Sequence, residues 1–129
     1  MGKETILIIE DEKSLREATT DALQRKDFLT LSAKNGKDGI NVALSKHPDL
    51  ILLDLIMPEM DGMTALKIIR QDTWGATVPV IILTNLSAIN GSVDHDAARH
   101  IPTQYLIKSD WKLNDIIKKI KKTLGMGSL

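Results

Sequence analysis

The chain has 129 residues, which suits one domain with a core large enough to fold without disulfides or a structural metal. Its 17 basic and 17 acidic residues give no electrostatic reason to expect direct binding to nucleic acid or to an anionic membrane. Cysteine is absent, which excludes disulfides and thiolate metal sites, and no apolar run is long enough to cross a membrane. The sequence therefore predicts a cytoplasmic domain whose partners bind local surfaces.

Short apolar runs bounded by turn residues predict β-strands along the chain. The clearest is Leu50–Leu53, which has no polar alternation and so predicts a strand buried on both faces, as in a parallel sheet covered by helices. Pro79 lies near the start of a later run, where a missing backbone donor is tolerated. The predicted strands are Thr5–Ile9, Phe28–Ala33, Leu50–Leu53, Val78–Leu83 and Gln104–Ile107.

The stretches between these runs have the spacing of amphipathic helices. Ser14 and Glu17 form a capping box that predicts the start of the first helix. Its predicted inner stripe consists of Leu15, Ala18, Ala22 and Leu23. Further helices are predicted between Asn35 and His47, over Met63–Gln71 and from Leu113 to Leu124. A short helix within Asn85–His100 has the weakest pattern.

Strands that alternate with helices of this size predict a parallel sheet with right-handed crossovers. The expected fold class is therefore α/β, with a doubly wound five-stranded sheet in the order 2-1-3-4-5 between two layers of helices. This order makes the first and third strands neighbours. We expect one domain over residues 1–124 and a frayed tail over 125–129.

Polar residues follow the strands at the edge where doubly wound sheets bind ligands. Glu10 and Asp11 follow the first strand, Asp54 follows the third, Thr84 the fourth and Lys108 the fifth. Each alone suggests only a helix cap or a strand end. Together the clustered carboxylates need a cation, and oxygen ligands favour Mg²⁺. A carboxylate beside Mg²⁺, an ammonium and a hydroxyl can attack phosphorus and form an aspartyl phosphate.

Glu10-Asp11, Asp54 within DLIMPEMDG, Thr84, Tyr105 and Lys108 resemble, in order and spacing, the response-regulator receiver domains of two-component signalling. The resemblance implies a flavodoxin-like fold in which Asp54 accepts a phosphoryl group from a histidine kinase or a histidine phosphotransfer protein. It further implies that Glu10, Asp11, Asp54 and the backbone carbonyl of Ile56 hold Mg²⁺, and that Lys108 pairs with the phosphoryl oxygens.

The resemblance also implies a conformational switch. Thr84 would move towards the phosphoryl group and Tyr105 would follow it inward, which reshapes a surface formed by segment 85–102, strand 104–107 and the last helix. Such a domain, a monomer or weak dimer, signals through protein contacts. It supports its own phosphorylation and dephosphorylation and is not a turnover enzyme.

Two positions depart from the usual receiver pattern, and one alternative function stays open. Asn85 stands where a smaller residue is usual, and Ser109 stands where the family commonly has a cis proline. Both residues are expected to change the kinetics of the phosphorylated state rather than the assignment to the receiver family. A hydrolase of the haloacid-dehalogenase-like type needs an acid two residues after Asp54, where the chain has Ile56. The open alternative is a receiver-like scaffold that is not phosphorylated, against which the intact site residues argue.

Overall fold

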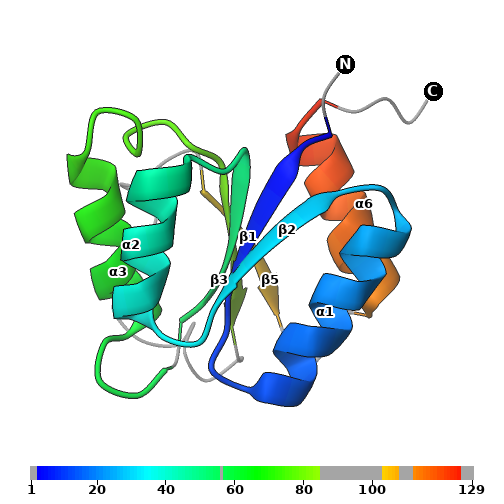
Figure 1. Cartoon of the computed structure of the whole chain (residues 1–129), viewed down its shortest axis with the longest axis horizontal. Coiled ribbons are helices and arrows are strands. Elements are labelled where there is room, and N and C mark those ends of the chain that lie inside the picture. The colour runs from blue at the N-terminus through cyan, green and yellow to red at the C-terminus, as the bar shows by residue number, and fades with distance from the viewer. Residues whose placement is uncertain (1–2, 56, 85–102, 108–111, 126–129) are drawn as a thin grey trace.

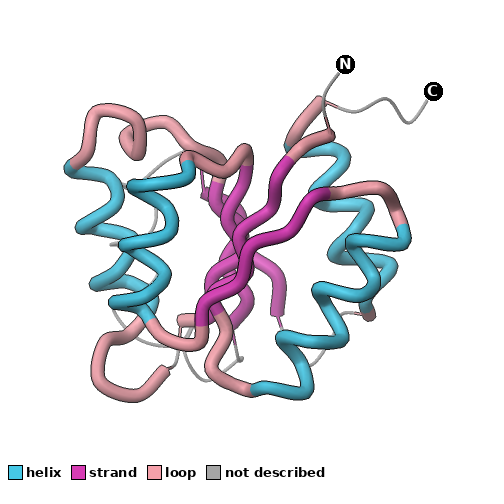
Figure 2. Tube along the Cα trace, viewed as in Figure 1, coloured by secondary structure: helices cyan, strands magenta, loops and turns pink. Residues whose placement is uncertain are grey.

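The computed structural model describes residues 3–55, 57–84, 103–107 and 112–125; of Thr84 and residues 103–107 it describes the backbone alone. Helices flank a central sheet on both sides, as Figures 1 and 2 show. The elements are, in order, β1 (Thr5–Ile9), α1 (Lys13–Arg25), β2 (Leu29–Ala33), α2 (Gly36–Lys46), β3 (Leu50–Asp54), α3 (Gly62–Gln71), β4 (Val80–Thr84), β5 (Thr103–Ile107) and α6 (Leu113–Thr123).

The five described strands form one sheet in the order β2-β1-β3-β4-β5, and every pair is parallel. This confirms the predicted fold class and strand order. Helices α2 and α3 cover one face, while α1 and α6 cover the other (Figure 1). Because all strands run in one direction, β1 and β3 reach the same edge of the sheet, from which α1 and α3 then begin.

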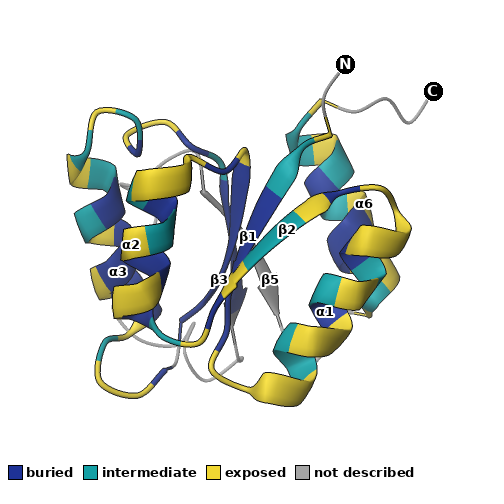
Figure 3. Ribbon diagram, in the orientation of Figure 1, coloured by how far each residue is buried: buried dark blue, intermediate teal, exposed yellow. Residues whose placement is uncertain are grey.

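Alternate residues of the central strands fill two separate cores, one on each face of the sheet. In β1, Leu7 and Ile9 pack towards α2 and α3, whereas Ile6 and Ile8 pack towards α1 and α6. In β3 all residues are buried, which explains the run without polar alternation. Figure 3 shows the central strands buried and the exposed residues of the helices turned outward.

The first helix differs from its prediction in two ways. It begins at Lys13 rather than near Ser14, its N-cap is Glu12, and no side chain caps it, so the predicted capping box is wrong. Thr19 is buried with Leu23, whereas Ala18 is exposed. Thr19 and Leu23 are four residues apart and therefore share a helix face. The Thr19 hydroxyl donates to the Leu15 carbonyl oxygen at 2.7 Å, so this hydroxyl keeps a hydrogen-bond partner although it is buried.

The fourth strand also starts later than predicted. It begins at Val80, and Pro79 lies just before it. The Pro79 carbonyl oxygen nevertheless accepts a hydrogen bond from the Ile51 amide at 3.0 Å, so proline contributes the one backbone group that it can offer to the neighbouring strand.

Several predictions lie outside the described residues: the short helix within 85–100, the geometry at Lys108 and Ser109, and most of the tail 125–129. Over the ranges that the structure describes, no helix has both the length and the apolar character needed to cross a membrane.

Candidate functional site

Strand register brings the acids of β1 and β3 together. Ile9 is the partner of Leu53 across these two strands, so Glu10, the next residue along, comes level with Asp54. Glu10 also donates its backbone amide to the Ala33 carbonyl oxygen of β2 at 3.0 Å, which keeps it in line with the sheet. The predicted meeting of the two strand ends is confirmed.

The side chains of Glu10, Asp11 and Asp54 form an acidic cluster at this edge. One carboxylate oxygen from each lies within 4.8 Å of the others. Glu10 and Asp54 are each only 2% exposed, whereas Asp11 is exposed. Like charges at such distances repel strongly when water is excluded, so a cation placed among them would be held firmly. An all-oxygen donor set of carboxylates fits a hard divalent cation such as Mg²⁺.

The turn between β1 and α1 orients the first carboxylate of the cluster. The backbone amide of Glu12 donates to Glu10 Oε2 at 3.2 Å. The turn is therefore closed by an acid that also belongs to the cluster, which explains why α1 starts directly after it. A helix N-terminus next to carboxylates also lowers their electrostatic cost.

The segment after Asp54 folds back closely onto the strand that it leaves. The Gly62 amide donates to the Leu55 carbonyl oxygen at 2.8 Å, and Asp61 caps α3 through its Oδ1, which accepts from the Thr64 amide at 2.8 Å. A Cβ atom at Gly62 would collide with the Asp54 carbonyl oxygen. Gly62 thus fixes the backbone of the residue at the centre of the cluster, which is more than the helix-starting role that its sequence suggests.

The remaining predicted site residues are only partly described. The backbone of Thr84 ends β4, one position beyond Leu83, which is level with Asp54. Thr84 is the register partner of Ile107, the last described residue of β5. Lys108 and Ile56 lie outside the described residues, as do the side chains of Thr84 and Tyr105.

Arg16 touches the site and was not among the predicted site residues. In the sequence it is one charged residue among several on a helix, and no motif marks it. Its Nη1 donates to the carbonyl oxygen of Glu10 at 2.9 Å. A contact to a backbone carbonyl depends on the fold of the turn, so residue identity alone gives no signal for it.

Comparison with known proteins decides which family has this arrangement. The family model of the response regulator receiver domain matches residues 6–121. The chain belongs to this family. A receiver domain acts in two-component signalling, where it supports its own phosphorylation and dephosphorylation rather than turnover of a separate substrate.

Curated relatives of this receiver domain are longer proteins. The chain is 34% identical over 112 residues to a protein-glutamate methylesterase/protein-glutamine glutaminase of Archaeoglobus fulgidus, and these cover 86% of the chain and 31% of that protein. It is 32% identical over 124 residues to the regulatory protein AtoC of Escherichia coli, with 96% and 26% covered. The chain thus spans about a third or less of these two relatives.

Solved structures share the fold of the receiver domain. A CheY-like response regulator receiver domain from Methanospirillum hungatei superposes with a TM-score of 0.86 at 19% identity, covering 96% of this chain and 95% of that one. The receiver domain of a Pseudomonas aeruginosa sensor histidine kinase superposes with a TM-score of 0.84 at 24% identity, covering 96% and 99%. That structure has a magnesium ion coordinated in its active site cleft.

Proposed function

We propose that Asp54 is the phosphoryl acceptor of this receiver domain and that Mg²⁺ is its cofactor. The acidic cluster carries the proposal: carboxylate oxygens of Glu10, Asp11 and Asp54 within 4.8 Å of one another, in a chain of the receiver family. Asp54 is the last residue of the central strand, so the sheet fixes the position of its backbone. Glu10 or Asp11 would share the cation with Asp54.

The chemistry is a phosphoryl transfer. A carboxylate oxygen of Asp54 forms a bond to phosphorus while the bond from phosphorus to the donor's leaving group breaks, and the electron pair leaves with that group. For a phosphohistidine donor the leaving nitrogen belongs to imidazole. When bound, Mg²⁺ supplies positive charge that offsets the charge of the transferring group and of the carboxylates. Asp54 ends β3 and Glu10 directly follows β1, so the sheet sets the positions of the nucleophile and of the acid beside it.

Further residues complete the proposed site. Lys108 would pair with the phosphoryl oxygens, and the Ile56 carbonyl oxygen would be an additional Mg²⁺ ligand. Thr84 and Tyr105 would switch on phosphorylation. The backbone supports this set, because Thr84 is the register partner of Ile107, the residue directly before Lys108.

We also propose the class of protein that donates the phosphoryl group and the surface that passes on the signal. A histidine kinase or a histidine phosphotransfer protein would supply the phosphoryl group, and a protein that contacts segment 85–102, β5 and α6 would receive the signal. Action as a monomer or weak dimer, a domain boundary near residue 124 and a cytoplasmic location stay predictions. A scaffold without phosphorylation remains the alternative.

Incubation with acetyl phosphate tests the proposal without the cognate kinase. With Mg²⁺, intact-mass measurement is expected to show the addition of one phosphoryl group, because the site itself assists the transfer. With EDTA in place of Mg²⁺ the modified fraction is expected to fall at least about tenfold, since the clustered carboxylates then repel the donor. A protein that stays unmodified with Mg²⁺, also in the presence of active histidine kinases, would instead support the scaffold.

The proposed switch has a separate test. Addition of Mg²⁺ and beryllofluoride, a stable mimic of the phosphoryl group, is expected to shift the backbone NMR signals of Thr84, Tyr105 and segment 85–102 together. The physical reason is that a group bound at Asp54 recruits the end of β4, to which β5 is hydrogen-bonded. Shifts confined to Asp54 and its immediate neighbours would contradict the switch.

A further inference from the structure

Arg16 lies in the first turn of α1 and reaches back across the turn that joins this helix to β1. Its Nη1 donates to the Glu10 carbonyl oxygen at 2.9 Å and, at 3.4 Å, to the Asp11 carbonyl oxygen. The Arg16 amide donates to the Glu12 carbonyl oxygen at 2.9 Å in the first hydrogen-bonded turn of the helix. Arg16 therefore contacts the backbone of both Glu10 and Asp11, the two cluster acids that follow β1.

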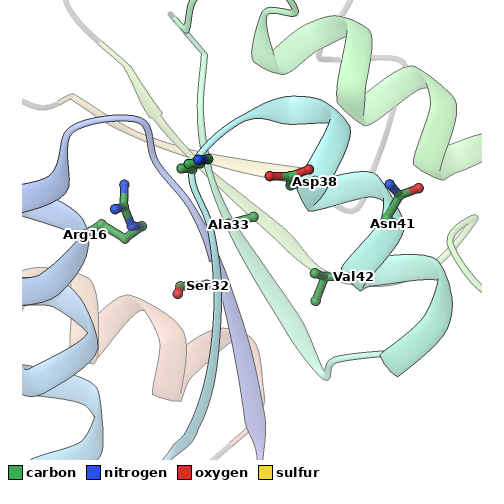
Figure 4. A pocket seen from close by; sticks show the side chains of 7 residues that line it. Arg16, Ser32, Ala33, Asp38, Asn41 and Val42 are labelled. Atoms are coloured by element: carbon green, nitrogen blue, oxygen red, sulfur yellow. The ribbon is translucent and has the colours of Figure 1, made fainter.

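Figure 4 shows how this side chain is placed. Arg16 extends from α1 beside β2, while Asp38, Asn41 and Val42 come from α2 beyond that strand. Together with Ser32, Ala33 and Lys34 they line an open pocket of about 430 Å³. Arg16 is half-buried at one side of this pocket.

The choice of acceptor atoms is the informative feature. Both hydrogen bonds that the Arg16 side chain makes in the described part of the chain go to backbone carbonyl oxygens. A guanidinium is well suited to a forked contact with carboxylates, yet here the Arg16 side chain hydrogen-bonds to the backbone of the turn and not to the carboxylate oxygens of the cluster. It fixes the position of the acids without competing for their ligand atoms.

We propose that Arg16 is a positioning residue that holds the Glu10-Asp11 turn in the geometry that binds Mg²⁺. This inference rests on the proposed function, because it assumes that the acidic cluster takes up that ion. Without Arg16, the mutual repulsion of the carboxylates would open the turn. Part of the free energy of Mg²⁺ binding would then be spent on closing the turn, so the affinity for Mg²⁺ would fall.

A purely electrostatic role makes the opposite prediction. A positive charge near the cluster repels Mg²⁺, so its removal would strengthen metal binding if charge were the only effect. Positioning and charge can thus be separated by the sign of the change in affinity.

Calorimetric titration of the metal-free full chain with MgCl₂ measures that sign. We expect Arg16→Met to weaken Mg²⁺ binding about tenfold, the size typical for loss of a contact behind a metal ligand. Arg16→Lys keeps the charge but lacks the planar fork, so its affinity is expected to fall between those of Arg16→Met and the wild type. Arg25→Met is the matched control: Arg25 is on the same helix, is exposed and pairs with Asp21, so the Mg²⁺ affinity of this variant is expected to change less than about twofold.

A structural readout accompanies the titration. In the metal-free Arg16→Met protein, the NMR signals of the Asp11 and Glu12 amides are expected to shift, because the Glu12 amide donates to Glu10 Oε2 in the intact turn. The signals of β3 and the thermal midpoint are expected to stay near their wild-type values. A general loss of structure would move all of these together.

The outcomes that overturn the inference are distinct from failure of the proposed function. Arg16→Met that binds Mg²⁺ as tightly as the wild type, or more tightly, overturns the positioning role while wild-type phosphorylation at Asp54 still stands. Arg16→Lys with wild-type affinity beside a tighter Arg16→Met assigns the effect to charge. A wild-type chain that takes up no Mg²⁺ overturns the metal site and this inference together.

Discussion

Replacement of Asp54 by Asn is expected to abolish phosphorylation by acetyl phosphate, with no mass increase where the wild type gains one phosphoryl group. The amide has nearly the same shape as the carboxylate, but its nitrogen and oxygen are poor nucleophiles at phosphorus. Asp54 lies at the end of β3 with a carboxylate oxygen in the acidic cluster, so the substitution removes the proposed acceptor while the neighbouring acids stay in place. Intact-mass measurement after incubation with acetyl phosphate and Mg²⁺ checks the prediction.

Asp61→Asn is the matched control for this experiment. Asp61 follows on the same connection and caps α3 through Oδ1, a role that asparagine also performs. Its modification by acetyl phosphate is expected to equal that of the wild type. Equal modification of Asp54→Asn and wild type would show that the phosphoryl group goes elsewhere, and peptide mapping of the modified residue would then locate it.

Replacement of Gly62 by Ala is expected to lower the free energy of unfolding by about 3 kcal/mol. The added Cβ would collide with the Asp54 carbonyl oxygen and would lie 2.8 Å from the Leu55 Cα, and backbone atoms cannot rotate out of the way as a side chain can. The connection from β3 to α3 must therefore move, which also displaces Asp54. Urea unfolding monitored by circular dichroism measures the loss, and slower phosphorylation is expected to accompany it.

Gly36→Ala provides the comparison because the two glycines occupy the same helix position. Each is the first helical residue after an Asn or Asp N-cap, Asn35 for α2 and Asp61 for α3. The three atoms nearest to a Cβ at Gly36 all belong to the Met60 side chain, with the sulfur at 3.0 Å, and that side chain is flexible. A change below about 1 kcal/mol is expected. Equal losses for both variants would mean that the helix position, rather than the backbone contact, explains the effect.

The strands of the fold could be predicted because their signals are local. Leu50–Leu53 is buried on both faces, and a continuous apolar run records this directly in the sequence. Asn35 was predicted to begin a helix and caps α2 by accepting from the Asp38 amide at 2.7 Å, since an asparagine side chain can reach only nearby backbone donors. The alternation of such elements then restricted the topology to the observed order.

The start of the first helix could not be predicted in the same way. Ser14 and Glu17 have the spacing of a capping box, but the Glu12 amide and Glu10 Oε2 close the preceding turn, and the helix begins at Lys13. The capping box does not form because the start of the helix is set by this turn, whose geometry depends on how β1 leaves the sheet. Burial of Thr19 in place of Ala18 has a similar cause, because the position of the neighbouring sheet and helices decides which helix face is covered.

The order of residues along the chain specified the residue types at the site and their place after strands: Glu10 and Asp11 follow one apolar run, and Asp54 follows another. It did so because burial of a parallel strand requires apolar residues up to the edge, where acids can meet solvent. Folding adds that their oxygens lie within 4.8 Å of one another, that Arg16 donates to the Glu10 carbonyl oxygen, and that Gly62 lies against the Asp54 carbonyl oxygen. Register, backbone contacts and close approaches join residues far apart in the chain, and no single residue type encodes them.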